Sequence, residues 1–112
     1  MRRSGSIATA IFLVAALALP AGAADLHSDH VGTECPDGSV GVWHFVNNQT
    51  EGAAQGTITA IFDGNVVIVQ LADKVLKNNQ HFTITGGTVL EDASTNLPGM
   101  LVLSDFTCES KK

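Results

Sequence analysis

The sequence has no tyrosine, one tryptophan and five phenylalanines. Exposed aromatic rings form the binding platform of many carbohydrate-binding proteins, and Tyr and Trp suit that role because each joins an apolar ring to a polar group. Tyrosine is missing here, and Trp43 lies in an apolar run that is typical of a buried strand. The composition therefore argues against carbohydrate binding by stacking.

Basic side chains are also scarce, with six lysines and arginines against eleven acidic residues. Two of the six, Arg2 and Arg3, begin the chain, so the basic residues after them are Lys74, Lys77, Lys111 and Lys112. A surface with this excess of negative charge repels phosphate backbones and anionic lipids. We therefore expect neither nucleic-acid binding nor binding to a membrane surface.

The sequence lacks the short motifs that accompany common catalytic and ion-binding sites. It has no G-x-S-x-G turn, no H-E-x-x-H pair and no D-x-D-x-D-G calcium loop. Gly86-Gly87 is not followed by the lysine and helix of a phosphate-binding loop, and Glu91-Asp92 would point to opposite faces of a strand. We predict no enzymatic activity, no catalytic residues and no cofactor.

The first residues have the pattern of a cleavable signal peptide. Two arginines precede a run of apolar and small side chains from Ile7 to Leu19, which Pro20 ends before the small residues Ala21 to Ala24. The alternative is a membrane anchor, but the run is shorter than the roughly 20 apolar residues that span a bilayer. We predict a signal peptide over residues 1–23, a secreted or periplasmic product and no membrane span after cleavage.

Two cysteines, Cys35 and Cys108, lie near the two ends of the predicted mature chain. An exported protein meets an oxidising compartment, where two cysteines have one possible intramolecular pairing. A domain of this size has a barely sufficient core, and closing so long a loop contributes about 4 kcal/mol in the chain-entropy account. We predict a Cys35–Cys108 disulfide; free thiols or an intermolecular bridge are the alternatives.

The mature chain is rich in β-branched residues, and no window has a helical apolar stripe over three turns. Asp63-Gly64 predicts a hairpin, since both residues tolerate the positive φ of a tight turn, and Gly86-Gly87 predicts a second one. Ala72–Asn79 is expected to be a helical turn or a crossover loop. The predicted strands are Val40–Asn47, Gly56–Phe62, Asn65–Leu71, Gln80–Thr85, Thr88–Glu91 and Met100–Thr107.

The first and last of these strands are apolar on both faces, which is typical of strands in the middle of a sheet. The spacing of the strands predicts an all-β fold: a small antiparallel β-sandwich of immunoglobulin-like or transthyretin-like proportions, with six or seven strands. A small barrel is the second choice. We expect one disulfide-closed domain over residues 35–112, preceded by a flexible acidic lead-in over residues 24–34.

The lead-in has the only close grouping of histidines with carboxylates. Cleavage after Ala24 would create the terminus Asp25-Leu26-His27, whose amine, two amide nitrogens and imidazole can wrap Cu(II) or Ni(II) in a square plane, with His30 nearby. Cleavage after Ala23, which the small-residue rule favours, abolishes this chelate. A solvated acidic lead-in without metal is the alternative.

Histidine also occurs within two predicted strands. His44 alternates with apolar residues, and Asp105 shares a strand face with Leu101 and Leu103, so we predict a buried hydrogen-bonded His44–Asp105 pair. His81 belongs to the exposed face of its own strand. If His44 and His81 converged with Asp105, a metal site would become possible.

Two polar segments are candidate binding loops on a rigid scaffold, with ordinary connections as the alternative. Asn48-Gln49-Thr50 also fits a glycosylation acceptor if the source is eukaryotic. The candidate loop residues are Asn47, Asn48, Gln49, Thr50, Ser94, Thr95 and Asn96.

These observations predict a small exported module that binds a protein partner or a component of the cell envelope, or has a structural role, without catalysis. The first alternative is extracytoplasmic Cu(II) or Ni(II) binding at the mature N-terminus, through Asp25, His27 and His30. The second is a secreted enzyme inhibitor that blocks its target with a protruding loop.

Overall fold

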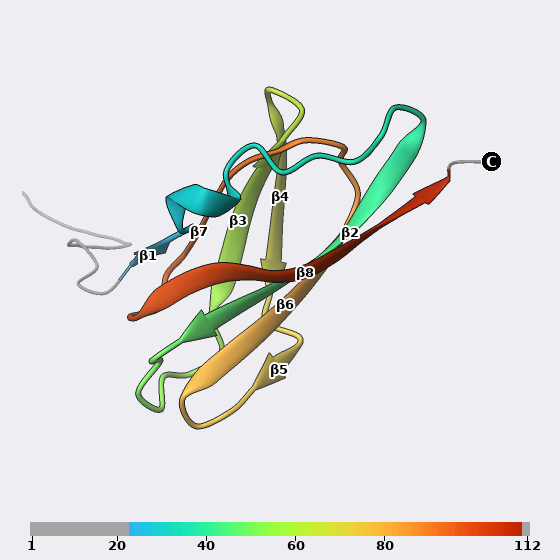
Figure 1. The fold of residues 1–112 in the computed structure, drawn as a ribbon. Helices are drawn as coiled ribbons and strands as arrows, with labels where there is room; N and C mark the ends of the chain where they lie inside the picture. Colours follow the sequence, from blue (N-terminus) through green and yellow to red (C-terminus); the bar gives the residue numbers. More distant parts are fainter. Residues whose placement is uncertain (1–22, 111–112) are drawn as a thin grey trace, which may run out of the picture.

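The computed structural model describes residues 23–110, and the predicted signal peptide, apart from Ala23, lies outside them. The described chain forms eight β-strands and one short 3-10 helix, η2 (Figure 1). In chain order the elements are β1 (Ala24–Asp25), η2 (Ser28–His30), β2 (Ser39–Asn48), β3 (Thr57–Phe62), β4 (Val66–Leu71), β5 (Lys74–Val75), β6 (Asn79–Thr85), β7 (Leu90–Thr95) and β8 (Met100–Ser110).

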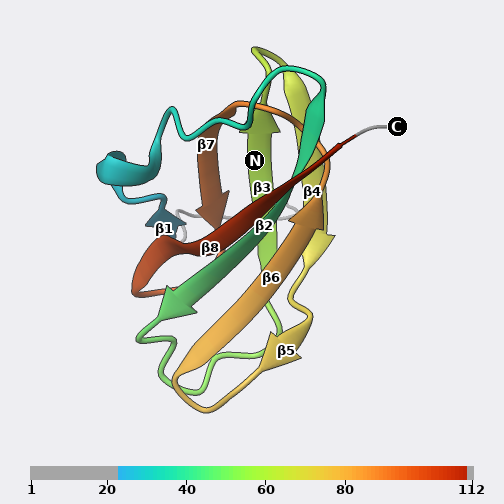
Figure 2. The ribbon, with the colours of Figure 1, turned by 45° about the vertical axis from the view of Figure 1, so that its right-hand side comes forward.

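The strands form two antiparallel sheets of four strands, in the orders β1-β7-β3-β4 and β5-β6-β2-β8. The sheets lie face to face, with β3 and β7 behind β2 and β8 in Figure 2. The predicted all-β sandwich is therefore confirmed. Each predicted strand overlaps one of the six longer strands, and β1 and β5 are added at sheet edges. Within residues 23–110 no helix is long and apolar enough to cross a membrane.

Alternation of side chains along each strand places one row of residues between the sheets. In β2 the residues at odd positions are buried, and those at even positions are partly buried as far as Val46; in β3 the residues at even positions are buried. Burial of the inner row removes its apolar surface from water, which is the main source of stability in a small domain. The largest apolar side chains of this core are Trp43, Phe45, Ile58, Phe62, Phe82, Ile84, Leu90 and Leu101.

The predicted Asp63-Gly64 hairpin joins β3 to β4 as expected. Asp63 and Gly64 have φ values of +54° and +90°, in the region that Asp, Asn and Gly tolerate best. The Asp63 carboxylate also accepts hydrogen bonds from the backbone N–H groups of Thr88 (3.0 Å) and Val89 (2.8 Å). The turn is thereby tied to the segment that precedes β7.

Gly86-Gly87 does not form the second predicted hairpin. It leads from β6 in one sheet to β7 in the other, and the strand that follows is Leu90–Thr95 instead of Thr88–Glu91. Gly87 has a φ of +79°, and a Cβ there would lie 2.5 Å from the Phe62 ring. The two glycines therefore allow a crossing between sheets at a point where the backbone touches the core.

The structure also corrects two predictions about sheet edges. Ala72–Asn79 is neither a helical turn nor a plain loop, because Lys74–Val75 within it pairs with β6 as the edge strand β5. The last strand, β8, is an edge strand and not a middle strand. Its pairing with β2 shifts register after His44, which leaves Ser104 as an extra residue in a β-bulge.

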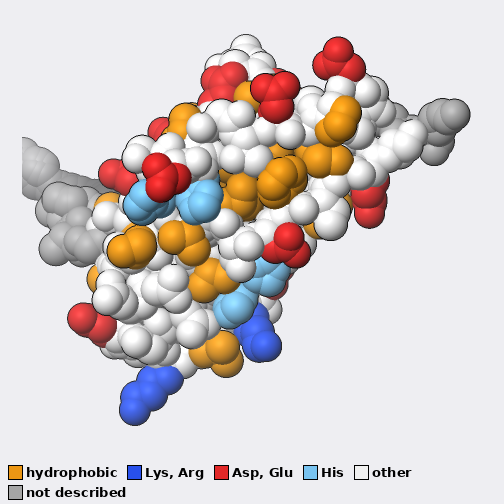
Figure 3. All heavy atoms as spheres, viewed as in Figure 1, with side chains coloured by type: hydrophobic (Ala, Val, Ile, Leu, Met, Phe, Trp, Pro, Cys, Tyr) orange, Lys and Arg blue, Asp and Glu red, His pale blue; other side chains and the backbone are white. Residues whose placement is uncertain are grey.

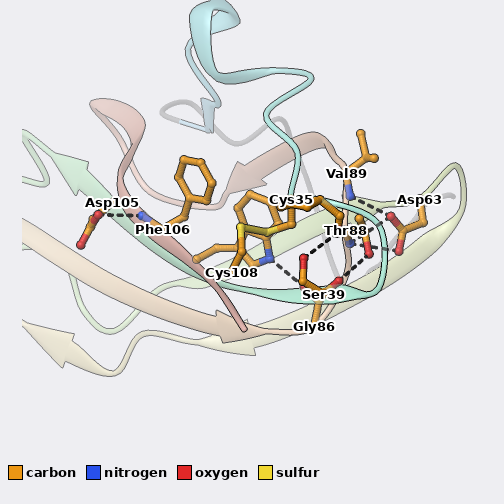
Figure 4. Close-up of a disulfide and its surroundings, with 11 residues drawn as sticks. Cys35, Ser39, Asp63, Gly86, Thr88, Val89, Asp105, Phe106 and Cys108 are labelled. Carbon is orange, nitrogen blue, oxygen red and sulfur yellow. Dashed lines mark hydrogen bonds between the residues drawn. A yellow bond between two sulfur atoms is a disulfide. The ribbon is translucent and has the colours of Figure 1, made fainter. Parts of the chain in front are cut away.

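Cys35 and Cys108 form the predicted disulfide, with their Cα atoms 5.6 Å apart and a sequence separation of 73. Cys35 is buried ahead of β2, and Cys108 lies in β8 (Figure 4). The backbone N–H of Cys35 donates to the carbonyl of Thr88 at 2.8 Å. The bridge therefore joins the segment that enters the sandwich to the strand that ends it.

The predicted flexible lead-in is ordered at its start. Ala24 and Asp25 form β1, which pairs with β7, and the side chains of Ala24 and Leu26 are buried in the core. Leu26 also bridges to Leu101 at the start of β8. The segment is held in place because its small and apolar residues cover the end of the sandwich. Its acidic composition had suggested a flexible segment instead.

Candidate functional site

The predicted N-terminal chelate conflicts with the backbone bonding of the same residues. It requires the amide nitrogens of Leu26 and His27 as deprotonated ligands. In the structure the Leu26 N–H donates to the carbonyl of Ala93 at 2.8 Å, and the His27 N–H donates to that of Leu101 at 3.0 Å. A square-planar copper or nickel site would therefore have to pull this segment off β7 and β8.

The side chains of the same segment also point away from a shared metal. The Nδ1 atom of His27 accepts a hydrogen bond from the backbone N–H of Asp29 at 3.3 Å, and the His27 and His30 rings stand 5.9 Å apart between centroids. Asp25 lies in β1 opposite Ser94. Across the described part of the chain, no group of three or more His, Cys, Asp or Glu side chains is placed to hold a metal ion.

Three of the candidate loop residues are buried: Asn47, Thr50 and Thr95. The Asn47 amide donates to the carbonyl of Pro98 at 2.8 Å and accepts from the Thr95 hydroxyl at 2.5 Å. The bond to Thr95 joins β2 of one sheet to β7 of the other, and the bond to Pro98 holds the loop between β7 and β8. Buried side chains cannot reach a partner. The prediction that Asn47, Thr50 and Thr95 are binding residues is therefore wrong.

The other candidate loop residues remain at the surface. Asn48, Gln49 and Asn96 are exposed, and Ser94 is partly so. Asn96 also accepts a hydrogen bond from the Thr57 backbone N–H at 2.9 Å, which ties its loop to β3. Ser94 and Asn96 line a surface hollow together with Thr57, Thr59 and Thr95.

The outer surface of β4 is a candidate site that the sequence did not indicate. We define the β4 surface as Val67, Val69 and Leu71, which are 56%, 62% and 57% exposed. The alternate residues face the other sheet: Ile68 packs against the core, and Gln70 donates to the backbone carbonyl of Thr83 at 2.7 Å. Three large apolar side chains thus stand in a row on an outer strand.

The same strand has an open hydrogen-bonding edge. β4 pairs with β3 along its whole length, and among residues 23–110 no strand pairs with its other side. Natural sheets protect such edges with short strands, charged residues or bulges. β1 and β5 have two residues each, and β8 carries a bulge with Asp105 and Glu109. β4 has six residues, no charge and no break in register.

A second grouping lies on the outer face of the β5-β6-β2-β8 sheet. His44 Nε2 in β2 and His81 Nδ1 in β6 are 2.9 Å apart, with the two rings perpendicular. His81 Nε2 in turn lies 2.9 Å from the side-chain oxygen of Asn79. Figure 3 shows histidine side chains grouped on the face in view, with Lys or Arg on one side of one group and Asp or Glu on the other.

These contacts fix the positions of the ring protons. An amide oxygen only accepts hydrogen bonds, so His81 Nε2 carries the proton and donates to Asn79. His81 Nδ1 is then the acceptor, and His44 Nε2 donates to it. The pair is thus a hydrogen-bonded chain that runs from His44 through His81 to Asn79.

Charged residues mark the two ends of this histidine pair. Lys74 of β5 lies opposite His81, and Asp105 of β8 lies opposite His44. The pKa of His81 is lowered below its usual 6.5, mainly because burial disfavours the charged ring, with further contributions from His44 and Lys74. His81 is therefore held in its neutral form.

The predicted buried His44–Asp105 pair does not form. His44 shares the outer face with its partly buried neighbours, whereas Asp105 is exposed and accepts a hydrogen bond from the Phe106 backbone N–H at 2.8 Å. The bulge at Ser104 places Asp105 on the outer face, opposite His44, so its carboxylate lies at the surface instead of in the core beside Leu103. His44 and His81 do come together, but they form no three-residue metal group with Asp105, which the alternative metal hypothesis required.

Comparisons of the chain with protein-family models, with curated proteins and with solved structures found no match.

Proposed function

We propose that this protein is an exported binding module that takes up an extended segment of a protein partner along the open edge of β4. The observation that carries this proposal is the six-residue, uncharged edge strand with its exposed apolar row. An extended peptide adds to such an edge through main-chain hydrogen bonds, and alternate side chains supply specificity. The disulfide fits the oxidising compartment that an exported protein meets.

The surroundings of β4 define the chemistry of the partner. Val67, Val69 and Leu71 favour a segment whose alternate residues are apolar, since those side chains would continue the exposed row. Asp63 and Asp73 flank the strand, and the whole chain is acidic. The best partner segment is therefore apolar on one face, with lysine or arginine at its ends.

Selection from a displayed library of linear peptides tests the proposal. We expect the selected peptides to alternate apolar residues, to carry basic ends and to protect the β4 amides from hydrogen exchange. Val69→Lys places a charge on the edge and should weaken binding at least tenfold, because charged edges resist pairing. Val31→Lys, at an exposed valine outside β4, is the matched control and should bind as the parent does.

The proposal is overturned if no peptide is selected, or if selected peptides bind Val69→Lys and the parent equally. Pairing of β4 with a second copy of the chain is the competing occupant of this edge. Light scattering distinguishes the two occupants. If the parent is a dimer, if Val69→Lys makes it a monomer and if the dimer does not bind the peptides, then β4 serves self-association and the partner proposal is wrong.

A further inference from the structure

We propose that His44 and His81 together bind a divalent copper ion on the outer face of the β5-β6-β2-β8 sheet. The inference is independent of the proposed function, because it concerns the opposite sheet from β4. It rests on the direct approach of His44 Nε2 and His81 Nδ1, which are 2.9 Å apart.

The separation of the two nitrogens favours one coordination geometry. With a metal–imidazole bond of about 2.0–2.1 Å, nitrogens at this separation subtend about 90° at the metal, whereas a tetrahedral ion needs them about 3.4 Å apart. Adjacent corners of a square plane meet at 90°, and square-planar nitrogen and oxygen sites are typical of Cu(II) and Ni(II). Cu(II) binds such donors more tightly than Ni(II) or Zn(II), so copper is the expected occupant.

The donor atom of His81 is already prepared for a metal. Its Nε2–H is engaged by the Asn79 side-chain oxygen, which leaves the Nδ1 lone pair directed toward His44. A hydrogen bond to the distal ring nitrogen is the usual way in which proteins orient a ligating histidine. Asn79 is therefore a positioning residue for this site.

His44 must change its tautomer to bind. Its Nε2 proton, which is donated to His81 in the metal-free protein, is lost to solvent as Nδ1 takes one up, so that two neutral imidazoles bind the ion with no net release of protons. Both rings must also turn away from the line between the two nitrogens, so that their lone pairs converge on the metal. The exposed face leaves the remaining corners of the square to water.

The charges around the pair have opposite effects on a cation. Lys74 on β5 opposes the metal and also favours neutral His81, whereas Asp105 on β8 lies across from His44 and attracts the ion. Two protein ligands make a weaker site than the three or four of a dedicated metal centre. Protonation of either ring competes with copper, so binding should weaken as the pH falls from 7.5 to 5.5.

Cu(II) titration followed by calorimetry and electron paramagnetic resonance tests the site. The protein carries His27→Ala, so that neither the His27 ring nor an N-terminal chelate contributes. In this background we expect one Cu(II) per chain and a spectrum with two coupled imidazole nitrogens. His44→Ala and His81→Ala should each lower the affinity at least tenfold.

Two further variants separate ligation from folding. Asn79→Ala should weaken copper binding several-fold while keeping the two-nitrogen spectrum, because Asn79 orients His81 without touching the metal. His30→Ala is the matched control and should bind copper as its parent does. Unchanged thermal unfolding of the metal-free variants shows that they remain folded, and His44→Gln replaces any alanine variant that does not.

The proposal is overturned if the His27→Ala protein binds no copper, if the spectrum shows a single nitrogen, or if His44→Ala and His81→Ala bind as tightly as their parent.

Discussion

Phe106 stacks on Trp43, with the ring centroids 5.3 Å apart and the planes at 12°. Simple alternation along the last strand puts Phe106 on the face opposite Leu101 and Leu103, away from the core. The bulge at Ser104 reverses this alternation, so that Phe106 faces the tryptophan. One extra residue in β8 therefore decides which aromatic ring closes this side of the sandwich.

Because of this stack, we expect Phe106 to contribute more to the stability of the fold than its 37% exposure indicates. Phe106→Ala should lower the free energy of unfolding by about 2 kcal/mol, because it removes both buried area and a stacked ring. Met100→Ala in the same strand, at a residue that is 48% exposed, should cost less than about 0.5 kcal/mol. Urea unfolding of both variants measures the difference, and equal midpoints would show that the stack contributes nothing.

Reduction of Cys35–Cys108 should destabilise the protein strongly. The bridge joins cysteines with a sequence separation of 73, and the chain-entropy account assigns about 4 kcal/mol to closing such a loop. Urea unfolding with and without reductant measures this loss. A Cys35→Ser, Cys108→Ser double variant is the control and should be insensitive to reductant. An unchanged midpoint on reduction of the parent would show that the bridge is dispensable.

Gln80 is fully buried and holds a connecting segment by its side chain. Its oxygen accepts from the Gly56 N–H at 2.8 Å, and its amide donates to the carbonyls of Ala53 and Ala54. Gln80→Leu leaves these backbone groups without their partner and should cost about 2–4 kcal/mol. Gln55→Leu, at an exposed glutamine with one hydrogen bond, is the control. Urea unfolding measures both variants, and an equal loss of unfolding free energy would contradict the role of Gln80 in holding this segment.

His81 should make stability depend on pH. Its pKa is lowered in the folded protein and 6.5 in the unfolded chain, so the unfolded chain binds more protons between the two values. The stabilisation is complete above pH 6.5 and is lost as the pH falls toward the folded pKa. Urea unfolding from pH 7.5 to 5.0 should show a steeper loss for the parent than for His81→Gln. Parallel curves would remove His81 as the cause.

Local chemistry was sufficient to predict the strands, the Asp63-Gly64 turn and the disulfide. Alternation of apolar residues is visible in a short window, a tight turn needs residues that tolerate positive φ, and two cysteines have one possible pairing. The buried faces of β3 and β6 follow from the same alternation. These features depend on neighbours in sequence, so the sequence alone carries them.

The candidate sites depended on contacts between distant residues. His44 and His81 are 37 positions apart and meet because β2 pairs with β6, and the bulge at Ser104 arises from the pairing of β8 with β2. Sheet order also decides that β4 is an open edge and that Gly86-Gly87 crosses between sheets.

By itself, the amino-acid sequence determined an acidic, all-β chain with one disulfide, because alternation, turn residues and cysteine count act locally. Only the tertiary structure decided which strands lie at an edge, which face Asp105 and Phe106 occupy, and that two histidines from different strands share a hydrogen bond. The physical reason is that strand pairing sets the register and order of a sheet, and both depend on residues far apart in the chain.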